Sequence, residues 1–112
     1  MASLIVGAAV YAIPSLPIFA ILVTVSSNDG KPVANLTAAN FKVYRVAPGA
    51  EERTIENFHD LSQAGPYGEA TSEGLYSLTL GAESAAGAKV FAVVVTRRPD
   101  RGQTLAAGVV PA

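Results

Sequence analysis

Few side chains in this 112-residue sequence could carry out catalysis. His59 is the only histidine, and Asp60 follows it, so the carboxylate could in principle orient a general base. The sequence has no Cys, and no Ser stands in a Gly-x-Ser-x-Gly turn, so the usual nucleophiles of covalent catalysis are missing. We therefore predict no catalytic residues and no enzymatic activity.

Metal binding has equally little support in the sequence. Zinc sites use three or four ligands, mostly His and Cys, and one histidine cannot supply them. Carboxylates in predicted loops, such as Asp29 and Glu73, suit calcium, but they lack the spacing of a calcium-binding loop. We predict neither a metal ion nor a cofactor.

A predicted hairpin tip at residues 97–102 is rich in arginine. Guanidinium groups present planar forks of N–H donors that match carboxylate, sulfate and phosphate groups, so this tip could bind an anion. A solvated charged turn is the simpler interpretation of the same residues. The three candidate side chains are Arg97, Arg98 and Arg101.

A second ligand-binding candidate is the long predicted loop at residues 59–73. Loops longer than about 12–15 residues are uncommon in compact domains and are often functional. This one contains His59 and Tyr67, and the ring of Tyr67 could stack on a sugar. The loop and the hairpin tip at 97–102 together predict, as one alternative, a module that binds a glycan or an anionic small molecule.

The charge balance argues against one class of partner. Eight basic residues against nine acidic ones give a net charge of -1, which provides no broad positive field for nucleic acid. Half of the residues are hydrophobic and 15% are charged, against about 25% charged in an average soluble chain. This composition excludes a disordered chain and predicts a well-filled core.

Residues 4–25 contain almost no polar side chain. A membrane-spanning helix needs about 20 apolar residues, but Pro14 and Pro17 would lie at its centre, at a cost of about 3 kcal/mol each. A secretion signal normally begins with Lys or Arg, and the first basic residue here is Lys31. We therefore favour no membrane span and expect two strands in this segment.

The first of these strands is predicted at Leu4 to Ala12 and the second at Ile18 to Ser26, separated by a proline-containing connection. The second strand is apolar on both faces, as is typical of a strand covered on both sides. The first strand lies either at the edge of its own sheet or against another copy of the chain. Its candidate contact residues are Leu4, Ile5, Val6, Val10 and Tyr11.

The rest of the sequence alternates strand patterns with turn signals. The polar segment 52–58 suits a sheet edge, whereas the β-branched run 90–96 suits a buried strand. Further strands are predicted at 41–46, 75–80 and 103–110. The pattern predicts an all-β sandwich of about seven or eight strands. It forms one domain over residues 1–112, with an apolar strand and its connection at 1–17 and the sandwich core at 18–112.

Two stretches resemble bacterial immunoglobulin-like modules of the invasin and transthyretin-like kinds. Val23-x-Val25, Asn28-Asp29-Gly30-Lys31-Pro32-Val33, Leu36-Thr37 and Phe41-x-Val43 are similar to the opening of such modules. Gly74-x-Tyr76-x-Leu78-x-Leu80 resembles a later strand, in which a tyrosine packs at the sandwich corner. The resemblance implies an immunoglobulin-like or transthyretin-like sandwich. It also implies a spacer, adhesive or assembly role in an extracellular, cell-surface or periplasmic protein.

Together these observations predict a non-enzymatic structural or interaction module. It would act through protein–protein association, most simply with itself, as a homo-oligomer or a filament subunit. The reason is that the strand at 4–12 adds apolar surface that a complete sandwich does not need. A strand donated to a neighbour would supply main-chain hydrogen bonds and apolar burial together.

Overall fold

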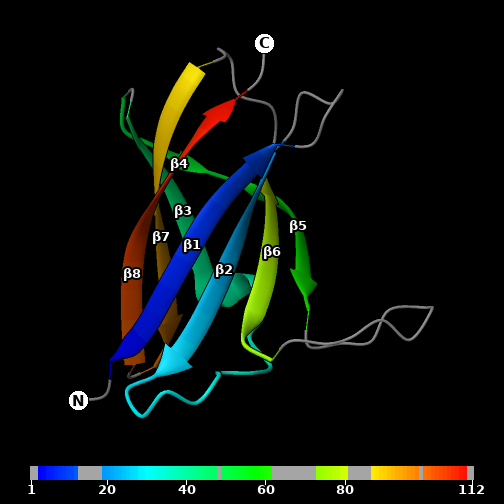
Figure 1. The fold of residues 1–112 in the computed structure, drawn as a ribbon, viewed down its shortest axis with the longest axis vertical. Coiled ribbons are helices and arrows are strands. Elements are labelled where there is room, and N and C mark those ends of the chain that lie inside the picture. Colours follow the sequence, from blue (N-terminus) through cyan, green and yellow to red (C-terminus); the bar gives the residue numbers. More distant parts are fainter. Residues whose placement is uncertain are drawn as a thin grey trace, which may run out of the picture.

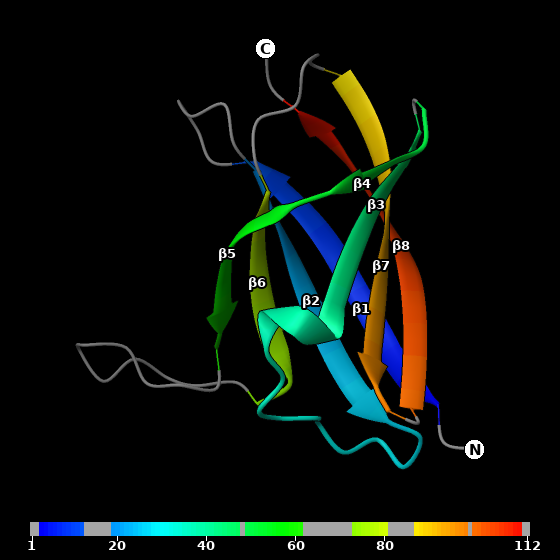
Figure 2. The same cartoon turned by 180° about the vertical axis from the view of Figure 1, so that it is seen from behind.

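A computed structural model of the chain describes residues 3–12, 19–47, 49–61, 73–80, 87–98 and 100–110. Within these residues the chain forms eight strands and one short 3-10 helix, arranged as two antiparallel four-stranded sheets (Figures 1 and 2). The predicted all-β fold is confirmed, and the two sheets are consistent with a sandwich. No helix in this part of the chain is long and apolar enough to cross a membrane.

The first sheet has the strand order β1-β2-β6-β5. Its members are β1 (Leu4–Ala12), β2 (Phe19–Ser27), β6 (Leu75–Leu80) and β5 (Ile55–Asp60). The register of β1 against β2 runs from Leu4 opposite Ser27 to Ala12 opposite Phe19. The apolar N-terminal strand is therefore an edge strand paired with the next strand of the same chain.

The second sheet has the strand order β4-β3-β7-β8. Its members are β4 (Glu51–Arg53), β3 (Phe41–Ala47), β7 (Gly87–Arg97) and β8 (Asp100–Val110), and the 3-10 helix η1 (Ala38–Asn40) leads into β3. The single strand predicted at 52–58 is two strands in the structure. The chain leaves the second sheet after β4 and enters the first at β5, with Thr54 between them.

β1 and β8 close one side of the two-layer structure. They run side by side in the same direction in Figure 1, and a parallel bridge joins Ser3 to Arg101. The inner face of β8 is made of small residues where β1 passes. At Gly108, an added Cβ would lie only 2.6 Å from the Cβ of Val10. Glycine therefore allows an approach between these two strands that a larger residue would prevent.

The core lies between the sheets, and three aromatic rings pack together in it. The ring centroid of Phe41 on β3 is 5.1 Å from that of Tyr76 on β6 and 5.4 Å from that of Phe58 on β5. The buried hydroxyl of Tyr76 donates a hydrogen bond to the carbonyl of Val33 at 2.6 Å, and accepts one from the N–H of Leu36 at 3.3 Å. One side chain thus fastens the β2–β3 connection to the core.

Two strands are less completely covered than their composition suggests. In β7 the inward side chains, such as Phe91 and Val93, are fully buried, but Val90 and Val94 on the outer face are only half-buried. In β2, Thr24 is exposed. The expectation that the strand at 18–26 is covered on both faces was wrong, because each sheet packs against the other through one face only. The β-branched run of β7 therefore also places apolar side chains on the outer surface.

Candidate functional site

The residues predicted to form a ligand site come from different parts of the fold. His59 lies at the end of β5 rather than in a loop, with its side chain exposed. Tyr67, with residues 62–72 of the predicted loop, lies outside the described residues. The β7–β8 hairpin tip belongs to the other sheet, at the end of the molecule where β5 also ends (Figure 1).

The three arginines of the hairpin tip have different surroundings. Arg97 ends β7, and its Nη2 atom lies 3.8 Å from Oδ2 of Asp100. Arg98 stands in the turn, and Arg101 is paired in register with Thr96. In the part of the chain that the structure describes, neither Arg98 nor Arg101 has an ion pair with a carboxylate. Two of the three guanidinium groups are thus available to an external anion.

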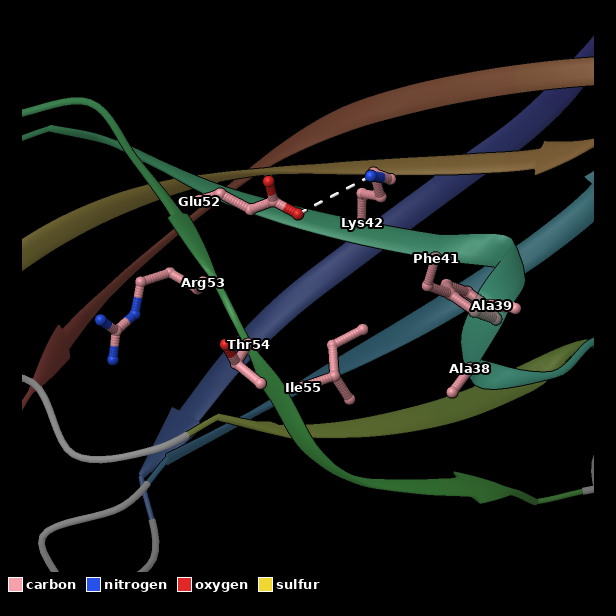
Figure 3. A pocket seen from close by; sticks show the side chains of 8 residues that line it. All are labelled: Ala38, Ala39, Phe41, Lys42, Glu52, Arg53, Thr54 and Ile55. Carbon is pink, nitrogen blue, oxygen red and sulfur yellow. Dashed lines mark ion pairs between the residues drawn. The ribbon is translucent and has the colours of Figure 1, made fainter.

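The larger of two hollows beside β3 lies where the chain crosses from β4 to β5 (Figure 3). It has a volume of about 610 Å³. Lys42 and Glu52 point toward one another across one side of it, with Nζ and Oε2 3.8 Å apart and both side chains exposed. The lining residues are Ala38, Ala39, Phe41, Lys42, Glu52, Arg53, Thr54 and Ile55.

This larger hollow offers little chemistry. Its lining contains no histidine, and its one carboxylate, that of Glu52, faces Lys42 in the open. Arg53, which also lines it, has its Nη1 atom 3.8 Å from Oε1 of Glu51. Across residues 3–12, 19–47, 49–61, 73–80, 87–98 and 100–110, no group of three His, Cys, Asp or Glu side chains is placed to hold a metal ion. The lining of the larger hollow does not assemble a general acid–base pair.

A smaller hollow of about 380 Å³ lies on the outer side of the second sheet, next to the larger hollow. Lys42 and Ala39 line both hollows. Its remaining lining residues are Asn40, Val94, Thr96 and Arg98, so cationic side chains from β3 and from the turn after β7 meet at one depression. Arg98 was among the predicted ligand-binding residues, but Lys42, 56 positions earlier in the chain, was not.

An uncharged strip runs along the β1–β8 side of the molecule. β1 and residues 102–110 of β8 contain no charged residue, and the two strands lie side by side. Ile5 on β1 is 57% exposed, and Leu105 and Val109 on β8 are 65% and 68% exposed. We call the exposed apolar residues of these two edge strands the seam surface: Ile5 and Ala9 on the outer face of the first sheet, and Leu105, Ala107 and Val109 on the outer face of the second.

The predicted contact residues of β1 divide between the two faces of the strand. Leu4 is buried, and Val6 and Val10 are partly buried and pack against the core. The side chain of Tyr11 lies outside the described residues. Of the other four predicted contact residues, only Ile5 is exposed. Leu105 and Val109 were missed, although the uncharged run at 102–110 was a signal for them.

The opposite side of the molecule, at β4 and β5, is charged. Glu51, Glu52, Arg53, Glu56 and Asp60 all lie on these two edge strands. The molecule has one charged side, at β4 and β5, and one uncharged side, at β1 and residues 102–110 of β8.

Comparisons of the chain with protein-family models, curated proteins and solved structures found no match.

Proposed function

We propose that the protein is a non-enzymatic β-sandwich module that acts through protein–protein association, and that it associates with a second copy of itself through the seam surface. The observation that carries this proposal is the uncharged strip formed by β1 and β8. As the resemblance implies, the module would be an assembly part of an exported or surface protein.

The distribution of charge supports this choice of surface. Edge strands commonly carry charged residues because these discourage pairing with other chains. β4 and β5 follow that rule with Glu51, Glu52 and Glu56, whereas β1 and residues 102–110 carry no charge. Strands of nine residues are about 30 Å long, so the strip is long enough for a specific contact. The side without charge is the side on which association meets no electrostatic penalty.

The same strip supports a second copy of the chain as the partner. A surface that buries Leu105 and Val109 must itself be apolar and uncharged, because burying an unpaired charge is costly. The seam surface of another copy has that chemistry. A two-fold axis would bring identical surfaces together, which is the commonest arrangement among soluble oligomers. Fully burying an exposed aliphatic side chain contributes about 1.5–3 kcal/mol, which offsets part of the entropy lost on association.

We further propose that the sandwich is of the immunoglobulin-like type. Constant-type immunoglobulin domains place strands A, B, E and D in one sheet and C, F and G in the other. The orders β1-β2-β6-β5 and β3-β7-β8 support this assignment, with β4 as an additional edge strand. In this assignment Tyr76 lies on strand E.

Sedimentation velocity of the full chain tests the association. We expect the unmodified chain to form a dimer at micromolar concentration and Leu105→Glu to be a monomer. Leu105 is 65% exposed, so the change should not disturb the monomer fold, which far-UV circular dichroism would check. The matched control is Val46→Glu, which places the same charge at a 46% exposed residue on β3.

The two variants separate the possible outcomes. A dimer that survives Val46→Glu but not Leu105→Glu places the contact at the seam surface. Loss of the dimer in both variants would indicate that the contact covers the whole outer face of the second sheet. A chain that is a monomer at all concentrations would overturn the proposal of self-association.

A further inference from the structure

The smaller hollow has walls that hydrogen bonds hold in place. The Asn40 side chain forms one of them, and its Nδ2 atom donates to the carbonyl of Thr96 at 2.9 Å. Its Oδ1 atom accepts hydrogen bonds from the backbone N–H and the hydroxyl of Thr37, at 2.8 and 3.2 Å. The helix η1 is thus tied to the end of β7, on one side of the depression.

The charged groups around this hollow are mainly positive. Lys42 and Arg98 line it, and Arg101 lies opposite Thr96 in the register of β7 and β8. Partners in antiparallel strands project on the same face of a sheet, so a third cationic side chain borders the same area. Glu52 is the nearby acidic group, and its contact with Lys42 is a 3.8 Å ion pair between two exposed side chains. Ion pairs between exposed side chains contribute little to stability.

We propose that this hollow binds the oxyanion group of a small ligand, a carboxylate, sulfate or phosphate, between Arg98 and Lys42. The guanidinium group of Arg98 would bind two oxygens of the anion, and the Lys42 ammonium would supply a second charge. Thr96 would offer its hydroxyl, while Ala39 and Val94 leave room for the apolar part of the ligand. The volume of about 380 Å³ lies within the usual range for small-ligand sites.

The residues of this site differ from those predicted from the sequence to bind a ligand. The site keeps Arg98 from the hairpin tip, adds Lys42 from β3, and does not include His59, which lies on the other sheet. Its residues are also distinct from the seam surface. Anion binding and self-association can therefore fail or succeed separately.

An NMR titration of the full chain with inorganic anions tests the site. Sodium acetate, sodium sulfate and sodium phosphate are added in separate arms at constant ionic strength, with sodium chloride as the reference. We expect saturable shifts of the amide resonances of residues 39–42 and 94–98 in at least one arm. A planar and a tetrahedral anion are compared, so the arms also show which oxyanion geometry the hollow prefers.

Three single substitutions make the test specific. Arg98→Gln should weaken binding about tenfold, because it removes a charge-assisted hydrogen bond. Glu52→Gln should strengthen binding about twofold to fivefold, because it releases Lys42 and removes a negative charge. Arg97→Gln is the matched control, since Arg97 faces Asp100 and does not line the hollow, and it should leave the dissociation constant unchanged.

Two results would overturn the proposal. One is the absence of saturable shifts in all three anion arms. The other is an equal loss of affinity in Arg97→Gln and Arg98→Gln, which would mean that the anions respond to general positive charge rather than to this hollow.

Discussion

The carbonyl oxygen of Leu4 lies directly beside the α-carbon of Gly102, where a Cβ atom would come within 2.2 Å of it. No side chain fits at that distance without displacement of one strand. Gly108 repeats the arrangement further along β8, against Val10. The close contact of β1 with β8 therefore depends on two glycines.

Gly102→Ala is expected to destabilise the fold by overpacking this contact. Forcing an additional carbon into a well-packed site costs about 1–3 kcal/mol. Urea unfolding followed by circular dichroism measures the change in the free energy of unfolding. The control is Gln103→Ala on the exposed face of β8, for which we expect a change below about 0.5 kcal/mol. Equal stability of Gly102→Ala and the unmodified chain would mean that β1 does not pack here in solution.

A disulfide bond can report which copy of the chain supplies β1. Ala9 on β1 is the register partner of Leu22 on β2, and the chain has no cysteine of its own. α-Carbons of directly opposed residues in antiparallel strands are about 4.5–5.5 Å apart, within the range of disulfide bonds. We expect the double variant Ala9→Cys, Leu22→Cys to oxidise within one chain and to run as a monomer on a non-reducing denaturing gel.

The single variants Ala9→Cys and Leu22→Cys serve as controls for random cross-linking. A covalent dimer formed by the double variant, but by neither single variant, would show that β1 is exchanged between two copies. In that case the seam would be built from two chains, and deletion of β1 from one copy would also affect its neighbour.

Tyr76→Phe is expected to lower the free energy of unfolding by about 1–3 kcal/mol. The substitution keeps the ring contacts with Phe41 and Phe58 but leaves the carbonyl of Val33 without the donor hydroxyl. Urea unfolding at neutral pH measures the loss. An unchanged free energy of unfolding would mean that water replaces the hydroxyl at no cost.

The same hydroxyl should make stability depend on alkaline pH. Burial raises the pKa of Tyr76 above the usual 10.0, and the nearby Asp60 carboxylate raises it as well. The hydrogen bond from the Leu36 N–H and the charge of Arg97 lower the pKa, but they do not cancel the effect of burial. The folded state therefore binds this proton more tightly than the unfolded chain. Its contribution is fully present below pH 10 and is lost as pH rises toward the folded-state pKa. Unfolding measured from pH 9 to 12 should show a steeper loss of stability in the unmodified chain than in Tyr76→Phe.

Local strand patterns were the part of the fold that sequence reasoning predicted well. The predicted strands at Leu4 to Ala12 and Leu75 to Leu80 agree with β1 and β6 at both ends, because alternation and flanking turn residues act locally. The crossing at Thr54 was missed, since a polar strand that changes sheets has the same residue pattern as one that does not. An alternating pattern records which side chains point the same way, not which sheet they join.

The candidate sites were harder to predict because each depends on residues that are distant in sequence. Arg98 was recognised as a potential anion ligand, but Lys42 comes near it only through the pairing of β3 with β7. Ile5 and Leu105 come to the same edge of the molecule only because the first and the last strand lie side by side. Neither relationship leaves a periodic signal in the sequence.

The contrast between the two sides of the molecule also bears on the stoichiometry of the assembly. Each subunit of a filament needs two binding surfaces, whereas each subunit of a two-fold symmetric dimer uses only one. The seam surface is uncharged, whereas the opposite side carries charged residues such as Glu51, Glu52 and Glu56, which are costly to bury against a neighbour. If the proposed pair forms, growth should then end after one contact, so that two copies make a closed unit with the charged edges facing the solvent.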